Sequence, residues 1–151
     1  MAKDTKDVIS TLNNLIETCR DGQEGFMHAA EQTKSPELQS LFDNFARQRS
    51  QFVNDLQVEV RRLGGDPEQH GSAGGSLHRG WIDLKAKITG RDEHAIVAEC
   101  ERGEDAAVRN YEEALEEDLP DDLLPVVERQ YMQIVQAHDR IRALETTTDK
   151  S

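Results

Sequence analysis

The stretch CRDGQEGF (Cys19–Phe26) returns in altered form 81 residues later as CERGEDAA (Cys100–Ala107). These stretches hold the only two cysteines of the chain, and both begin with the spacing Cys-x-x-Gly. A second internal similarity, at an offset of 82, aligns RQRSQF (residues 47–52) with RQYMQI (residues 129–134). Such self-similarity is typical of a duplicated unit. We therefore interpret the chain as two copies of one unit related by a pseudo-twofold axis, with small residues where the copies meet.

Hydrophobic periodicity identifies that unit as a helical hairpin. Apolar residues recur at three-and-four spacing over four stretches, about residues 4–32, 36–64 and 92–117, and a fourth that begins between residues 120 and 125 and ends near residue 146. Ser35 followed by Pro36 is a start signal for the second stretch, and the pair Gly64-Gly65 is a stop signal. Four helices of this length are each about 40 Å long. They therefore match one another as the rods of one bundle.

The lengths of the connections predict the topology. Short turns join the first helix to the second and the third to the fourth, so each pair forms an antiparallel hairpin. The crossover between the hairpins is long enough to return along the whole bundle, and its segment 77–88 predicts a short amphipathic helix with the only tryptophan, Trp81. We expect one all-α domain with hairpins at about 4–64 and 92–146, a crossover at about 65–91 and a frayed tail at 147–151.

The charge balance narrows the classes of partner. Thirty acidic residues against eighteen basic residues give a formal net charge of −12. This charge repels phosphate backbones and anionic lipid, so neither nucleic acid nor a membrane is the expected partner. The first residues contain no signal-peptide core and no stretch is apolar enough to span a bilayer, so we expect a cytoplasmic protein.

Several sequence motifs of this chain resemble those of an uncharacterised bacterial family of four-helix-bundle proteins, classed as a domain of unknown function. The resemblance rests on LIETCRDGQEGF (15–26), FARQRSQFVNDLQVEVRRLGGDPE (45–68), LHRGW (77–81), ECERGEDAAV (99–108) and ERQYMQIVQAHDRI (128–141). It covers nearly the whole chain and implies a ferritin-like fold in a bacterial cytosol. It implies no reaction.

Ferritin-like metal proteins hold two ions with a Glu from the first and third helices and a Glu-x-x-His from each of the others. This sequence has no Glu-x-x-His. The pseudo-equivalent positions offer Gln23 or Glu24, Ala46-x-x-Arg49, Glu104 and Glu128-x-x-Tyr131. A guanidinium brings a fixed positive charge to the place of a cation, which argues against a two-metal oxidase centre.

Arg49 lies on an otherwise apolar stripe, where an unpaired guanidinium would strongly destabilise the fold. We predict that it pairs with Glu104, or failing that with Glu24, within a polar core cluster. The predicted members of that cluster are Gln23, Glu24, Arg49, Glu104, Tyr131 and His138. The alternative is a polar pocket that binds a small anion or a single metal ion. A single Fe, Mn or Zn ion would be held by Glu104, Glu128 and His138 with one or both cysteines, although no cofactor is the first expectation.

The two cysteines allow two interpretations. Buried free thiols behave as small apolar side chains, which is the first expectation for Cys19 and Cys100. Alternatively they form a redox disulfide across the pseudo-twofold axis, which needs Cα atoms within about 7 Å.

The sequence is compatible with three functions. The first is a non-enzymatic, stress-related or interaction protein with a degenerate metal site, and the second is a metal-binding or redox protein. The third is a partner-binding scaffold that uses the crossover helix and Trp81. No fifth helix follows the fourth, so we expect a monomer or homodimer.

Overall fold

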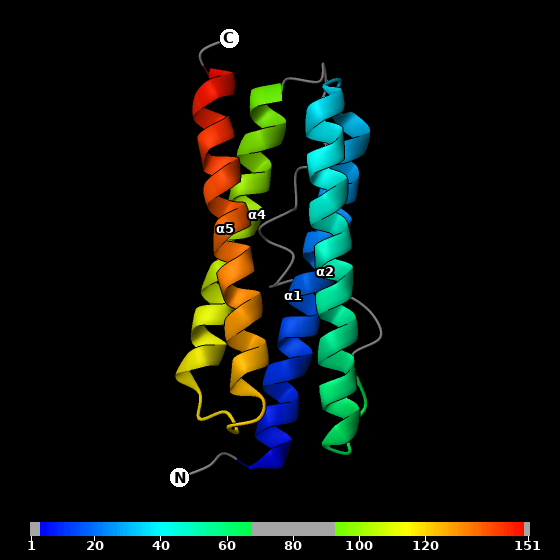
Figure 1. Cartoon of the computed structure of the whole chain (residues 1–151), viewed down its shortest axis with the longest axis vertical. Helices are drawn as coiled ribbons and strands as arrows, with labels where there is room; N and C mark the ends of the chain where they lie inside the picture. The colour runs from blue at the N-terminus through cyan, green and yellow to red at the C-terminus, as the bar shows by residue number, and fades with distance from the viewer. Residues whose placement is uncertain (1–3, 68–92, 150–151) are drawn as a thin grey trace.

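The computed structural model describes residues 4–67 and 93–149, which form four long helices (Figure 1). They are α1 (Thr5–Gln32), α2 (Pro36–Arg62), α4 (Glu93–Glu116) and α5 (Leu124–Asp149). The described residues contain no strand, so the predicted all-α four-helix architecture is confirmed. The short crossover helix predicted at 77–88, with Trp81, lies outside the described residues.

Side chains and glycine set the ends of the first two helices. The Asp4 carboxylate accepts a hydrogen bond from the Lys6 backbone N–H at 3.3 Å, and the Ser35 hydroxyl oxygen accepts one from the Leu38 N–H at 3.2 Å. These caps satisfy N–H groups that have no partner within a helix. α2 ends where Gly64 adopts a φ of 88°, a left-handed conformation that favours glycine.

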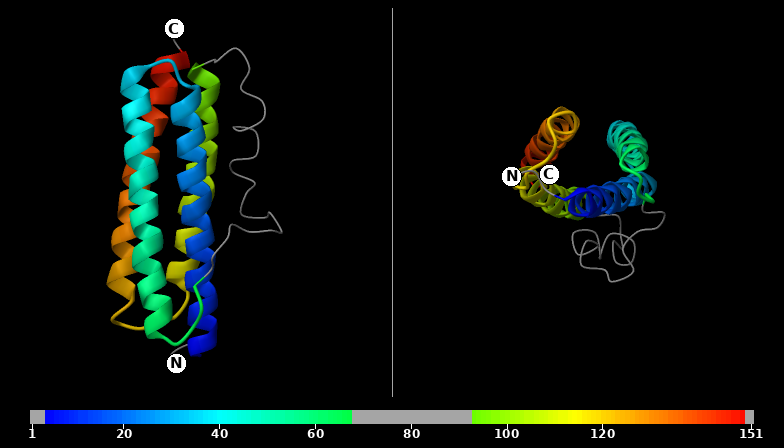
Figure 2. Two further views of the ribbon diagram at one scale, coloured as in Figure 1. Left: turned by 90° about the vertical axis from the view of Figure 1, so that its right-hand side faces the viewer. Right: turned by 90° about the horizontal axis from the view of Figure 1, so that it is seen from below.

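The helices form two antiparallel hairpins that meet through α1 and α4. α1 packs on α2, α4 packs on α5, and α1 contacts α4 between the hairpins. Seen along the bundle, the order is α2, α1, α4, α5 in an arc (Figure 2). α2 and α4 run in the same direction, so the end of α2 and the start of α4 lie at opposite ends of the bundle (Figure 1). This is the topology that a single long crossover predicts.

The core consists of two apolar clusters stacked along the bundle. One cluster uses the N-terminal part of α1 and the C-terminal part of α2, and includes Leu12, Ile16, Leu56, Val127 and Ile134. The other uses the opposite ends of these helices, and includes Phe26, Phe42, Ile96, Val97 and Ile141. Arg49 and Glu104 fall between the two clusters on α2 and α4, and both have 0% exposure. A polar level therefore divides the core.

Burial reveals the register of the two hairpins. All but one of the buried positions of α2 correspond, at an offset of 81, to buried positions in α5 or just before it; the pairs include Phe42 and Leu123, Arg49 and Gln130, Val53 and Ile134, Leu56 and Ala137, and Val60 and Ile141. The exception is Phe52, which corresponds to the half-buried Gln133. The offset of 82 that the RQRSQF similarity predicted is therefore wrong by one residue. One residue turns a side chain by about 100° around a helix axis. Gln130, and not Tyr131, is consequently the counterpart of Arg49.

None of the four described helices has the combination of length and apolar composition that crossing a membrane requires.

Candidate functional site

The centre of the bundle holds a buried ion pair between α2 and α4. The two Arg49 Nη atoms donate to the two carboxylate oxygens of Glu104, at 2.5 and 2.6 Å. Neither residue is exposed to solvent. The pairing that the sequence predicted for Arg49 is present, and its bidentate geometry is the strongest that a guanidinium and a carboxylate can adopt.

The rest of the Arg49 side chain is enclosed as well. Its Nε donates to the Gln48 side-chain oxygen at 3.2 Å, and its guanidinium lies 5.4 Å from the centre of the Phe26 ring. A Cβ atom added to Gly22 would lie 3.2 Å from Nη1 of Arg49. The absence of a side chain at Gly22 therefore makes room for the guanidinium of α2, in addition to the α1–α4 contact that the repeat predicted.

Electrostatics keep Arg49 charged. Burial on its own would lower the pKa of Arg49, but the charge and hydrogen bonds of Glu104 raise it above its usual value. The guanidinium is therefore a permanent cation at the centre of the core.

A second buried chain of hydrogen bonds joins α1, α4 and α5 beside the ion pair. The Tyr111 hydroxyl donates to the Gln130 side-chain oxygen at 2.8 Å and lies 3.1 Å from Sγ of Cys19. We call Cys19, Arg49, Glu104, Tyr111 and Gln130 the polar layer. Tyr111 and Gln130 are not among the predicted cluster members. Gln130 was missed because the offset of 82 assigned the inward position of α5 to Tyr131.

Tyr131 lies outside the polar layer, which corrects its predicted place. It is half-buried, and its hydroxyl donates to the Glu112 carboxylate at 2.8 Å on the α4–α5 side. Glu24 and Glu128 are exposed, and Gln23 is half-buried. Of the six predicted cluster members, the structure brings only Arg49 and Glu104 together in the core.

The two cysteines are too far apart for the alternative disulfide. Both are buried free thiols. Cys19 lies level with Tyr111 on α4, and Cys100 precedes Tyr111 by about three helical turns, or about 16 Å. A disulfide needs Cα atoms within about 7 Å, so the thiol pair is ruled out in this fold. Antiparallel packing of α1 on α4 matches Cys19 with Tyr111, and not with Cys100.

His138 lies between α4 and α5, away from Glu104 and from the core. Its Nε2 is 2.5 Å from the nearer Asp105 oxygen and 3.9 Å from a Glu101 oxygen, and its Nδ1 is 3.3 Å from Asp139. Burial alone would lower its pKa, but hydrogen bonds with Asp139 and Asp105 raise it. The predicted set of Glu104, Glu128 and His138 is therefore not assembled. An offset of 81 would have predicted that His138 lies outside the core, since it matches His138 with Gln57, which is half-buried.

The comparison with family models decides the family. The model described as "Domain of unknown function (DUF2383)" matches residues 7–117, which is most of the chain.

The chain belongs to the DUF2383 family.

A comparison with curated proteins gave no match. Solved structures show which fold this DUF2383 chain has. It is similar to a two-domain protein of Anabaena variabilis with DJ-1/ThiJ/PfpI-like and ferritin-like domains, at a TM-score of 0.79 and 16% identity over 97% of this chain and 41% of that one. It is also similar to Dps1 of Mycobacterium smegmatis, at a TM-score of 0.76 and 15% identity over 93% of this chain and 96% of that one. A dodecameric thioferritin, the bacterioferritin-related protein of Bacteroides fragilis, has a TM-score of 0.79 and 14% identity over 97% of this chain and 89% of that one.

At these identities the likeness establishes the fold alone, and the predicted ferritin-like bundle is confirmed. The residues of this DUF2383 chain do not fit the two-metal centre that such folds carry. With the register corrected, the Glu-x-x-His positions hold Ala46 with Arg49 on α2 and Val127 with Gln130 on α5. Both oxygens of Glu104 are already bonded to Arg49.

The acidic residues beside His138 predict that the stability of the protein depends on pH. A hydrogen bond with Glu145, burial, and the charges of Glu145 and Asp105 raise the pKa of Glu101 from 4.5 to about 7, against a smaller opposing effect of His138. Arg142, with Nε 3.7 Å from a Glu101 oxygen, is the basic side chain nearby. Folded chains therefore retain a proton that unfolded chains lose, and the free energy of unfolding should fall as pH rises from about 4.5 to about 7.

Urea unfolding at pH 5 and pH 8 in the presence of a chelator measures this effect. The Glu101→Gln variant, which cannot lose the proton, should be more stable than wild type at pH 8 and should show a shallower pH dependence. An unchanged pH dependence in this variant would contradict the assignment to Glu101.

Proposed function

We propose that this DUF2383 chain is a non-enzymatic, cytosolic ferritin-like bundle that acts by binding a partner, with an ion pair in the place of a core metal centre. The observation that carries the proposal is the bidentate pair of Arg49 and Glu104 at the middle of the bundle. A stress-related setting belongs to the same proposal. The relatives of known structure support the fold and leave the role open.

The acid–base properties of the core support a non-catalytic role. Burial raises the pKa of Cys19 to about 11, and that of Cys100 well above its usual value. Burial likewise raises the pKa of Tyr111 well above its usual value. Catalytic acids, bases and thiolates need pKa values near the working pH. The pKa values of these core groups are instead shifted upward, away from neutral pH.

Thiol reactivity tests this point. Because both thiols are buried and protonated near neutral pH, we expect no alkylation of Cys19 or Cys100 by iodoacetamide in native protein at pH 8, and complete alkylation of both in urea. Mass spectrometry of the intact chain measures the number of adducts. Rapid modification of either cysteine in the folded state would contradict an inert core.

Iron oxidation tests the proposal itself. We expect purified wild-type protein to oxidise Fe(II) no faster than the buffer does, and a variant without the Arg49–Glu104 pair to behave in the same way. The matched variant carries Arg49→Met and Glu104→Leu, because replacing both partners of a buried ion pair by apolar residues leaves a protein that can fold. Rapid oxidation by wild type that is lost in this double variant would overturn the proposal in favour of a core metal centre.

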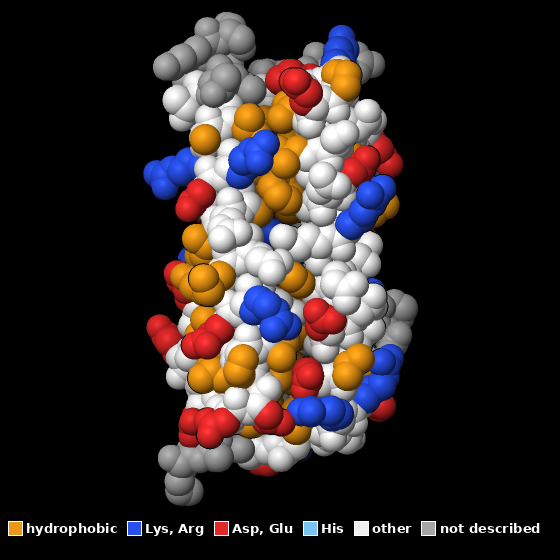
Figure 3. All heavy atoms as spheres, in the orientation of Figure 1, with side chains coloured by type: hydrophobic (Ala, Val, Ile, Leu, Met, Phe, Trp, Pro, Cys, Tyr) orange, Lys and Arg blue, Asp and Glu red, His pale blue; other side chains and the backbone are white. Residues whose placement is uncertain are grey.

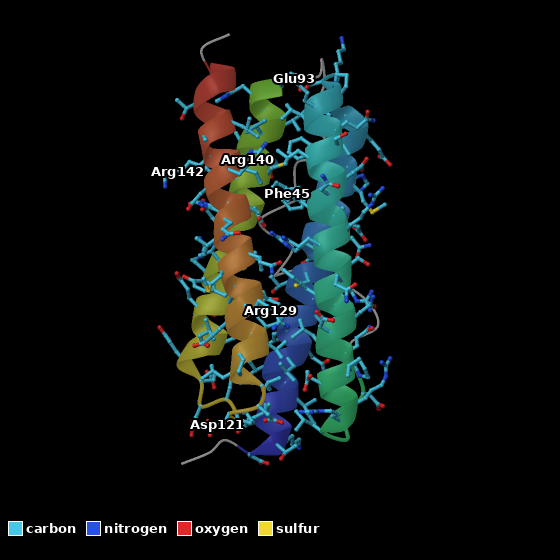
Figure 4. All side chains as sticks on the ribbon, viewed as in Figure 1. Phe45, Glu93, Asp121, Arg129, Arg140 and Arg142 are labelled. Carbon is cyan, nitrogen blue, oxygen red and sulfur yellow. The ribbon has the colours of Figure 1, made fainter. Side chains whose placement is uncertain are left out.

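The face along α2 and α5 supports an interaction role. Figure 3 shows apolar side chains along the seam between these helices, with charged side chains on both sides. Leu41 and Phe45 of α2 and Leu144 of α5 are partly buried against the second core cluster, and Figure 4 labels Phe45 on this side of α2. The alternative scaffold surface, Trp81 on the crossover, lies outside the described residues.

The assembly state is part of the same proposal. A monomer or homodimer is expected here, whereas the Bacteroides fragilis relative is described as dodecameric. Light scattering coupled to size-exclusion chromatography measures the mass directly. A twelve-subunit mass would contradict the expectation.

A further inference from the structure

We propose that Glu101 and Asp105 of α4 and His138 of α5 bind one divalent transition-metal ion, at a site on the α4–α5 face that is separate from the polar layer. This inference goes beyond the proposed function, since it assigns a ligand to a different place in the fold.

The three side chains converge in the way that a metal site requires. Each offers one ligand atom, and these atoms all lie within 4.8 Å of one another. Glu101 and Asp105 are four residues apart on α4, so they share one face of that helix. Ligand atoms around a tetrahedral zinc ion at about 2.1 Å lie about 3.4 Å apart, so small side-chain rotations would close the site.

Burial and second contacts orient the histidine. The His138 side chain is 13% exposed and that of Glu101 is 18% exposed, while Asp105 is 48% exposed and leaves the site open to solvent. Nε2 of His138 faces Asp105 and Glu101, and Nδ1 lies 3.3 Å from the Asp139 carboxylate. A metal-binding histidine is usually oriented in this way, by a carboxylate on its other nitrogen.

The charges around the site favour a cation. Glu101 forms a hydrogen bond with Glu145 and also lies near Asp105, so three carboxyl groups gather here. Arg142 is 3.7 Å from Glu101 but is 72% exposed, and Figure 4 shows it on the outer side of α5. An exposed guanidinium neutralises a half-buried carboxylate such as Glu101 only weakly. A divalent ion bound directly by the carboxylate oxygens would neutralise the negative charge of the site more completely.

The donor set indicates the class of ion. One imidazole nitrogen with carboxylate oxygens suits the borderline ions Zn(II), Fe(II), Co(II) and Mn(II). Mg(II) and Ca(II) prefer oxygen ligands alone. If the site binds no metal, the same contacts form an ordinary ion pair between protonated His138 and Asp105. A site of that kind would not bind added metal ions, whereas a metal site would.

Titration with Co(II) and Zn(II) separates these cases. We expect wild-type protein, purified without a tag and stripped with chelator, to bind one Co(II) per chain with visible absorption bands of a nitrogen-bound ion, and Zn(II) to displace it. Losing even an outer partner of a metal-binding histidine costs about 10–100-fold in affinity, so His138→Gln should raise Kd by about 100-fold or more. Asp105→Asn should raise Kd by about 10-fold or more.

The control is His28→Gln, which removes a histidine whose Nδ1 is 3.6 Å from Glu31 within one helix. This variant should bind Co(II) like wild type, and circular dichroism should show all variants folded. Absence of binding by wild type at millimolar Co(II) would overturn the inference. So would equal affinity in wild type and both His138→Gln and Asp105→Asn.

Discussion

Replacing Glu104 by alanine should lower the free energy of unfolding by about 3–5 kcal/mol, because it leaves the Arg49 guanidinium buried without a counter-charge. Arg49 is fully buried and gives both Nη atoms to Glu104. The Gln48 side chain, which accepts from Nε, carries no charge and cannot replace the carboxylate. Urea unfolding followed by circular dichroism measures the loss.

Two variants make this prediction specific. Removing both partners, with Arg49→Met and Glu104→Leu, should recover most of the loss, since no charge is then left in the core. Glu112→Ala removes an acid of the same helix that bonds the half-buried Tyr131 at the surface, and it should cost less than about 1 kcal/mol. Equal destabilisation by Glu104→Ala and Glu112→Ala would contradict a buried, paired Glu104.

Replacing Gly22 by leucine should cost about 2–3 kcal/mol, because the new side chain would compete with Arg49 for the same space. Even the Cβ atom would lie 3.2 Å from Nη1 and 3.5 Å from Cγ of Arg49. Moving Arg49 aside to admit the leucine would strain its two hydrogen bonds to Glu104. Glycine is normally a poor residue for a helix interior, and the close approach of Arg49 gives one reason for its occurrence here, beside the α1–α4 contact.

The matched control for Gly22→Leu is Met27→Leu on the same helix, where the side chain is 46% exposed. It should change stability by less than about 0.5 kcal/mol. In the apolar double variant of Arg49 and Glu104, Gly22→Leu should cost less than in wild type, because the bonds that fix the side chain are gone. An additive cost would show that Gly22 does not act through Arg49.

Much of this fold follows from local patterns in the sequence. The apolar residues Val8, Leu12, Leu15, Cys19 and Phe26 recur at helical spacing in the first predicted helix, and all five side chains are buried. Ser35 and Gly64 mark the ends of α2 because caps and left-handed glycines act within a few residues. The partner of Arg49 was also predictable, since a buried guanidinium needs a carboxylate and Glu104 lies on the inward face of α4.

The polar layer could be predicted only in part, because one helix was placed out of register. The three-and-four spacing of Tyr131 and His138 with Val127, Ile134 and Ile141, together with the match of RQRSQF to RQYMQI, put Tyr131 and His138 in the core. The same apolar residues are equally compatible with Gln130 facing inward, as it does. Identities over six residues are a weak guide to rotation about a helix. Glu101 and Asp105 were missed for a related reason: their approach to His138 depends on how α4 and α5 pack, which neither helix encodes alone.

The central claim is that a guanidinium–carboxylate pair fills the middle of this bundle in place of metal ions. A crystal structure of protein grown with Fe(II) or Zn(II), with anomalous difference maps recorded above the metal edge, tests it most directly. The claim predicts continuous density for direct Arg49–Glu104 hydrogen bonds and no anomalous peak in the polar layer, whatever is found at His138. A peak bound by Glu104, with Arg49 turned away, would contradict it.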